Sequence, residues 1–181
     1  MKKSPIAVFL GVALGFALFP TMFYLYLWSG LAPVKASAPP LPLEHLFAKT
    51  ALHAQMDKEC PKSVPISPDL NALAAGAAIY RDNCSVCHGV PNRPETTIGA
   101  GMFPRAPHLF AGRDMITDDP PGETFWKAKN GIRLTGMPGF SSSLTDEQLW
   151  QVSVLLASAD KLPVSIVQII IAEPKSTDRL K

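Results

Sequence analysis

The sequence predicts an all-α protein in which one apolar helix at the N-terminus precedes a small helical domain. The first observation behind this is an unbroken run of 24 residues without a charged side chain, Pro5–Trp28. The second is that apolar side chains recur later in the chain at helical spacing, next to residues that favour helix starts and stops. The 181 residues are enough for one ordinary domain with additions.

The apolar run predicts a membrane anchor. As a helix it would be about 36 Å long, and the hydrocarbon core of a bilayer is about 30 Å thick. Lys2 and Lys3 precede it, so the positive-inside rule predicts a single-pass helix in the cytoplasmic (inner) membrane, with the rest of the chain on the periplasmic side. A cleaved signal peptide is the alternative, because Ala-Ser-Ala at 36–38 fits a cleavage site. The length of the run, and Pro39 directly after the cut, favour the anchor.

Residues 1–30 are therefore the predicted anchor, and residues 31–66 follow as a linker and an accessory helix. The linker is rich in Pro, Ala, Gly and Ser. Apolar side chains at helical spacing predict an amphipathic helix over residues 43–58, which Pro61 and Pro65 separate from the next element. Its apolar positions are Leu43, Leu46, Phe47, Leu52 and Met56.

Residues 67–162 form the predicted central domain. Its first helix is expected to start with Ser67 as the cap and Pro68 in the first turn, and to run to about Arg81. Gly and Pro are frequent over residues 89–121 and apolar periodicity is weak, which predicts a loop with short turns.

Two further helices are predicted in the second half of this domain. A short one is expected over residues 122–130. The last one begins after Thr145, because two acidic residues in the first turn favour the helix dipole. Residues 163–181 are a C-terminal extension, and their first part, 163–171, is apolar with a pattern that fits either a helix or a strand.

The charge after the anchor argues against nucleic acid as a partner. Beyond residue 36 the chain has 14 Lys and Arg residues and 15 Asp and Glu residues, a net charge of −1. Nucleic-acid binding usually requires a basic face. The chain has only three cysteines, which excludes a disulfide-rich scaffold.

The run Cys84-Ser85-Val86-Cys87-His88 predicts the attachment site of a haem. The two thiols can form thioethers with the two vinyl groups of the porphyrin, and the histidine that follows can ligate the iron. A redox dithiol would need a βαβ setting, and a zinc site would usually need a second ligand pair; the sequence shows neither. A structural disulfide fits an exported protein but leaves the histidine unexplained.

Met137 is the predicted second axial ligand of the iron, together with His88. It lies 49 residues later, in a Gly-Met-Pro-Gly run, and such residues allow a loop backbone to approach the flat haem closely. A lone methionine is more often core filler, and histidines are more often at the surface or bonded locally. The other candidates are Met102, Met115, His45, His53 and His108.

Residues 68–162 resemble a class I cytochrome c. The resemblance consists of the C-x-x-C-H motif near the start, Gly-Met-Pro late in the domain, and a closing helix. It implies an all-α, cytochrome c-like haem domain with one covalently bound haem c. That haem would be bound through Cys84, Cys87, His88 and Met137, with the last two as the metal ligands.

The resemblance also implies two packing features. The first and last helices of the domain should cross closely, with Gly76 and Tyr80 on the first and with Trp150 and Leu155 on the last. The carbonyl of Pro107 should accept the imidazole N–H of the motif histidine, which orients the ring and raises its basicity.

The function that follows from this resemblance is one-electron transfer rather than enzymatic catalysis, because both axial positions of the iron are filled. With the anchor, it implies a carrier of a periplasmic respiratory chain whose partners are a membrane oxidase, reductase or dehydrogenase. One alternative is a haem c electron-transfer subunit of a membrane-associated dehydrogenase or oxidase complex. Another is a haem peroxidase with an open site, which requires Met137 to be off the iron. Cys60 is left over and is expected to be a free thiol.

Overall fold

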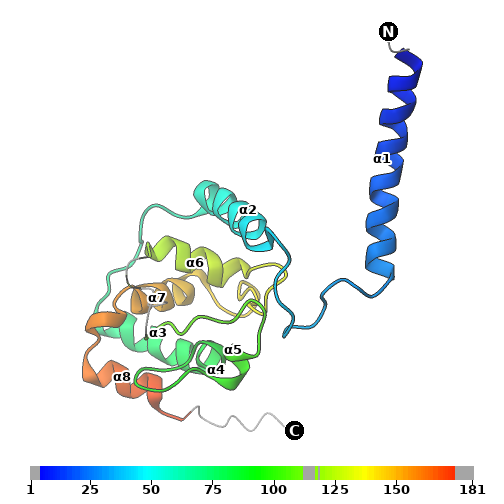
Figure 1. Ribbon diagram of the computed structural model, residues 1–181. Coiled ribbons are helices and arrows are strands. Elements are labelled where there is room, and N and C mark those ends of the chain that lie inside the picture. The colour runs from blue at the N-terminus through cyan, green and yellow to red at the C-terminus, as the bar shows by residue number, and fades with distance from the viewer. Residues whose placement is uncertain (1–4, 112–116, 118, 174–181) are drawn as a thin grey trace. The chain divides into compact units, whose positions relative to one another are not determined.

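The computed structural model describes residues 5–111, 117 and 119–173 (Figure 1). These residues form helices joined by loops, and no strand occurs among them. The expectation of an all-α fold is confirmed. Lys2, Lys3 and the candidate ligand Met115 lie outside the described residues.

The first helix, α1 (Pro5–Trp28), contains a window from Phe9 to Trp28 that is long and apolar enough to cross a membrane. None of that window is buried within the protein, and Phe16, for example, is 80% exposed. Its length and composition are those of a helix that could cross a bilayer. The chain divides into two compact units, residues 1–45 and residues 46–181, and α1 lies in the first.

Helix α2 (Glu44–Glu59) occupies the position predicted for the accessory helix. Its predicted apolar face is only partly used, because Met56 is buried whereas Phe47 is 66% exposed. At its C-terminal end the Trp126 indole N–H donates to the Glu59 carboxylate over 2.9 Å. This hydrogen bond lowers the pKa of Glu59.

Helix α3 (Leu70–Asn83) begins later than the sequence suggested. Its cap is Asp69 rather than Ser67, and the Asp69 carboxylate accepts the backbone N–H groups of Asn71 and Ala72, each over 2.9 Å. Asp69 therefore satisfies two of the backbone N–H groups that a helix start leaves unpaired. The Asp69 carboxylate also carries a negative charge that the helix N-terminus favours.

The remaining helices follow the predicted order. Helix α6 (Pro121–Asn130) agrees with the short helix expected over 122–130. Helix α7 (Asp146–Leu156) is capped by Thr145, whose side chain forms a reciprocal capping box with Gln148. A 3-10 turn, η2 (Ala159–Lys161), leads to α8 (Val164–Ile171), so the ambiguous tail is a helix.

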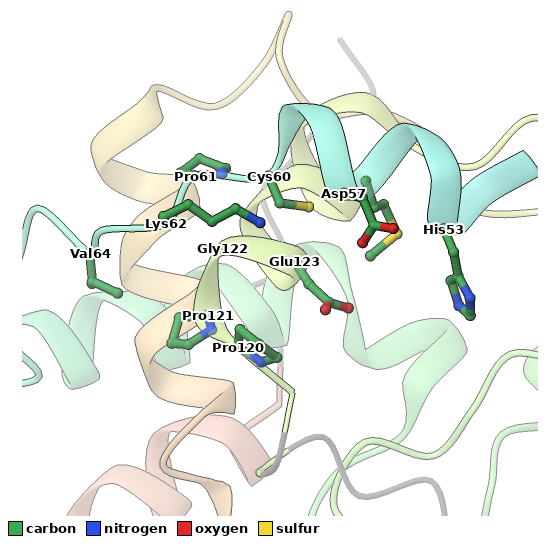
Figure 2. Close-up of a pocket in the computed structure, with 11 residues that line it drawn as sticks. His53, Asp57, Cys60, Pro61, Lys62, Val64, Pro120, Pro121, Gly122 and Glu123 are labelled. Atoms are coloured by element: carbon green, nitrogen blue, oxygen red, sulfur yellow. The ribbon is translucent and has the colours of Figure 1, made fainter.

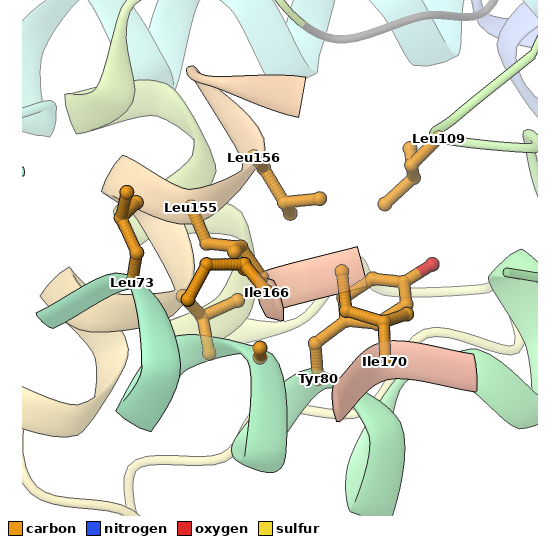
Figure 3. Close-up of a cluster of buried hydrophobic side chains, with 9 residues drawn as sticks. Leu73, Tyr80, Leu109, Leu155, Leu156, Ile166 and Ile170 are labelled. Atoms are coloured by element: carbon orange, nitrogen blue, oxygen red, sulfur yellow. The ribbon is translucent and has the colours of Figure 1, made fainter. Parts of the chain in front are cut away.

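The main core lies where α3 packs against α7 and α8. Figure 3 shows side chains from these three helices converging, with Leu109 from a loop beside them. Helix α8 contributes Ile166 and Ile170, which are 2% and 1% exposed, so the first part of the C-terminal extension is part of this core. The buried members are Leu73, Ala77, Tyr80, Leu109, Val152, Leu155, Leu156, Ile166 and Ile170.

The crossing of α3 and α7 depends on Gly76. A Cβ at this position would lie 2.3 Å from the backbone oxygen of Gln151 and 3.2 Å from the Cβ of Leu155. Tyr80 and Leu155 belong to the same buried cluster, so three of the four residues expected at this crossing are there.

Trp150 was expected at the same crossing and is not part of it. It stacks on Phe125 of α6, with ring centroids 4.3 Å apart and planes inclined by 16°, in a second cluster. Residues 150 and 155 project from α7 about 140° apart at 3.6 residues per turn. Leu155 can therefore face α3 while Trp150 faces α6.

Candidate functional site

The C-x-x-C-H motif begins where α3 ends and continues as a single turn of helix, α4 (Ser85–His88). The Cys84 carbonyl accepts the N–H groups of Cys87 and His88, over 3.1 and 3.0 Å. The two motif cysteines are not joined in a disulfide. Burial, and secondarily Cys87, raise the pKa of the Cys84 thiol to about 12, so this thiol is neutral at physiological pH.

The imidazole of His88 is held from one side. Its Nδ1 lies 2.8 Å from the carbonyl oxygen of Pro107, and a carbonyl can only accept, so Nδ1 is the protonated nitrogen. Burial lowers the pKa of His88; the Pro107 hydrogen bond opposes this and the neighbouring His108 adds to it. The ring is therefore neutral, with Nε2 available as a metal ligand. The hydrogen bond expected at Pro107 is present, whereas its role toward a cofactor stays a prediction.

The chain turns sharply after His88. Gly89 has φ +74°, in the left-handed region that glycine adopts without strain. The buried hydroxyl of Tyr80 donates to the Gly89 carbonyl over 2.8 Å. The Tyr80 ring also meets Phe110 edge-on, with centroids 5.1 Å apart. Tyr80 thus connects the helix crossing to the backbone just beyond the motif.

We expect the substitution Tyr80→Phe to destabilise the protein by about 1–3 kcal/mol, because the Gly89 carbonyl would lose its donor within a buried environment. Urea unfolding of the purified protein measures this. The matched control is Tyr26→Phe in α1, which should change the unfolding free energy of the domain by no more than about 0.5 kcal/mol. Equal stability of the two variants would contradict the role assigned to the Tyr80 hydroxyl.

The other face of the motif turn packs against a second short helix, α5 (Thr97–Ala100). The Thr96 hydroxyl donates to the Cys87 carbonyl over 3.0 Å. A Cβ on Gly99 would lie only 2.2 Å from the same carbonyl oxygen. The stretch predicted as a loop with short turns thus contains one helical turn, and that turn lies against the carbonyl of Cys87.

Met137 lies on a separate loop, between α6 and α7. Its carbonyl accepts the N–H of Ile132 over 3.2 Å, and its own N–H donates to the Thr135 hydroxyl over 3.1 Å. Gly131, at the start of this loop, has φ +69°. The backbone of Met137 is thus held on both sides, and its side chain is partly exposed.

The glycines beside Met137 bring protein segments close together. A Cβ on Gly139 would lie 2.7 Å from the carbonyl of Asn130, and one on Gly136 would lie 2.8 Å from the Met102 sulfur. Met102 therefore packs against the Met137 loop, in agreement with the packing role expected for it.

The remaining candidate ligands have other surroundings. His108 forms the expected local hydrogen bond, with the backbone N–H of Phe110, and a second one with the carbonyl of Arg93, 15 positions away. His45 and His53 are exposed residues of α2. Sequence reasoning did not find Tyr80 as a support for Gly89, nor Met102 as a neighbour of Gly136. For Tyr80, the available sequence signal was Gly89, because a glycine directly after the motif indicates a sharp turn whose backbone groups need hydrogen-bond partners.

A separate cavity of about 400 Å³ lies between α2 and the start of α6 (Figure 2). Cys60 lines it, is 8% exposed, and is a free thiol as expected; burial raises its pKa. Among the described residues no group of three or more His, Cys, Asp or Glu side chains is placed to hold a metal ion. The cavity is lined by His53, Met56, Asp57, Cys60, Pro61, Lys62, Val64, Pro120, Pro121, Gly122 and Glu123.

One known protein family matches the part of the chain that contains the C-x-x-C-H motif. The family model for cytochrome C oxidase, cbb3-type, subunit III matches residues 71–156. No curated protein matches the chain.

Among solved structures, a reducing HAO-like protein complex from Kuenenia stuttgartiensis matches with 23% sequence identity and a TM-score of 0.46. The match covers 54% of this chain and 47% of that one, so the chain spans about half the length of the protein that it matches. A likeness of this degree says nothing about function.

Proposed function

Since residues 71–156 form a class I c-type cytochrome domain, whose cofactor is a covalently bound haem c, we propose that Cys84, Cys87, His88 and Met137 hold a single haem that carries one electron at a time. Electron transfer is what a domain of this kind implies. We further propose which residues attach and ligate the haem, where the domain is located, and what its partners are.

The observation that carries the proposal is the state of the motif residues. Cys84 directly precedes the helical turn α4 and Cys87 lies within it, and both are free thiols. His88 uses Nδ1 for the Pro107 carbonyl, which leaves Nε2 for the iron. A haem attached through two thioethers and one imidazole needs this donor set, so the residues present fit the group.

The chain's own residues would tune such a haem in three ways. The Pro107 carbonyl orients the His88 ring and raises its basicity. A thioether ligand from Met137 favours the reduced state and so raises the reduction potential. Apolar surroundings act in the same direction, because they disfavour the more highly charged oxidised centre. Bound haem supplies the one-electron couple.

For the location, we propose that α1 anchors the chain in the cytoplasmic membrane and that the cytochrome domain lies on the periplasmic side. The length and composition of α1 support this. A tether raises the effective concentration of the domain near membrane partners. We propose a membrane oxidase, reductase or dehydrogenase of a respiratory chain as those partners.

A second candidate function is that of a haem c subunit within a larger membrane redox complex. The observation that favours it is the family model itself, which describes a subunit of an oxidase. Purification from native membranes in mild detergent separates the two candidates. A free carrier should migrate alone, and a subunit should co-purify with a catalytic chain in fixed ratio.

Removing both motif cysteines should abolish covalent haem attachment. We expect the double variant Cys84→Ala/Cys87→Ala to lose all haem stain on a denaturing gel, because no thioether can form. Cys60→Ala is the matched control and should retain full stain, since Cys60 lies in the cavity beside α2. Stain retained by the double variant, or lost in Cys60→Ala, would contradict the proposed attachment.

A further inference from the structure

The ring of His108 bridges two segments of backbone next to the motif. Its Nδ1 lies 3.2 Å from the backbone N–H of Phe110 and accepts that hydrogen. The remaining proton is therefore on Nε2, which donates to the Arg93 carbonyl over 3.1 Å. Both nitrogens are used by backbone groups, so the ring has a single orientation and a single tautomer.

The same ring fills the space above Gly89. A Cβ on Gly89 would lie 2.6 Å from the His108 Nε2, so this close approach requires a residue without a side chain. The His88 carbonyl also accepts the Leu109 N–H over 3.4 Å. The backbone just after His88 and the backbone just after Pro107 are thus held at a fixed separation.

We propose that His108 is a positioning residue that sets the hydrogen bond between His88 and Pro107. Gly89 follows His88 directly and Pro107 precedes His108 directly, so the contact of the His108 ring with Gly89 determines how closely the Pro107 carbonyl approaches Nδ1. This proposal rests on the proposed function in one respect, namely that His88 ligates the iron. A shorter hydrogen bond makes the imidazole a stronger donor to the metal, and His108 thereby acts on the potential without touching the haem.

The experiment compares two variants of the full-length haem protein with the wild type. His108→Phe keeps an aromatic ring and removes both hydrogen bonds. His108→Asn keeps an acceptor for the Phe110 N–H and removes the donor to Arg93 and the contact over Gly89. The control is His53→Phe, on an exposed position of α2.

Two quantities are measured in each protein. In the reduced protein, NMR gives the rate at which the His88 Nδ1 proton exchanges with solvent, which we expect to rise about tenfold in His108→Phe because a hydrogen bond is weakened. Redox titration should show a higher reduction potential, because a less basic imidazole stabilises the oxidised iron less. His108→Asn should shift both quantities in the same direction at least as far, because it also removes the contact over Gly89. His53→Phe should shift neither.

An unchanged exchange rate of the His88 Nδ1 proton in a folded His108 variant would overturn the proposal. This rate reports on the hydrogen bond itself and does not depend on what else sets the reduction potential. If His108→Phe does not fold, His108→Asn decides by the same criterion. Failure of the proposed function has a different signature. In that case the wild type would itself lack histidine–methionine spectra, whatever the exchange rates of the variants.

Discussion

Replacing Met137 with alanine should lower the reduction potential by about 0.2–0.3 V, a fraction of the range of about 0.8 V over which axial ligands set haem potentials. A thioether favours ferrous iron, and water or hydroxide in its place does not. The loop should keep its shape, because the backbone of residue 137 is held by Ile132 and Thr135 through groups that the substitution leaves intact. The change should therefore be confined to the iron.

The variant should lose the sulfur-to-iron absorption band of the oxidised protein, and its reduced form should bind carbon monoxide at neutral pH. Met102→Leu is the matched control, since Met102 packs on Gly136 and a leucine of similar volume should cost less than about 1.5 kcal/mol. A Met137→Ala protein that keeps the band would make another methionine the ligand. Carbon monoxide binding by the wild type would instead favour the open-site peroxidase.

The substitution Gly76→Val should destabilise the domain by about 3 kcal/mol, at the upper end of the usual cost of overpacking. The first carbon added would lie 2.3 Å from the backbone oxygen of Gln151, and a backbone atom inside a helix cannot move aside as a flexible side chain can. Helices α3 and α7 would have to separate, with loss of contacts around Leu155.

Urea unfolding of the haem-loaded protein measures this cost. The control is Asn71→Val, at an exposed position of the same helix, which should change stability by no more than about 0.5 kcal/mol. Gly76→Ala should lie between the two, because alanine improves helix propensity by about 1 kcal/mol and still carries the colliding carbon. If valine at 76 costs no more than valine at 71, the close crossing is not what stabilises the domain.

The features that could be predicted from the sequence are those decided by neighbouring residues. The start of α7 follows from Thr145 and Gln148, which satisfy each other's backbone groups within one turn. The predicted start of α3 is misplaced by two residues, because Ser67 and Asp69 are both good caps and only the structure shows that the Asp69 carboxylate accepts the free N–H groups. The residues near a helix start therefore predict that a helix is present, but they do not fix which of two neighbouring residues caps it.

Features that depend on distant partners were harder to predict. Apolar spacing showed that Trp150 faces a core but not which helix it meets, and the stacking partner Phe125 is on α6. The tail is ambiguous because the nine mostly apolar residues 163–171 suit a helix or a strand. Packing of Ile166 and Ile170 against α3 resolves it.

The candidate site shows the same division. The motif residues lie within five positions and are recognisable from spacing alone, whereas the support for them comes from far along the chain. Met102 meets Gly136 across 34 positions, and nothing in the local sequence of either residue indicates the other. Pro107 was expected only through the resemblance to a family.

The stretch that begins at Thr96 touches the two parts of the candidate site in succession. Thr96 and Gly99 hold the carbonyl of Cys87, and Met102, three residues further on, packs against Gly136. The short segment 96–102 therefore packs against both the helical turn that contains Cys87 and the loop that contains Met137. Packed segments of this kind resist gradual deformation. If His88 and Met137 ligate a haem iron as proposed, that iron should have a low reorganisation energy, because packing restrains both segments when it gains or loses an electron.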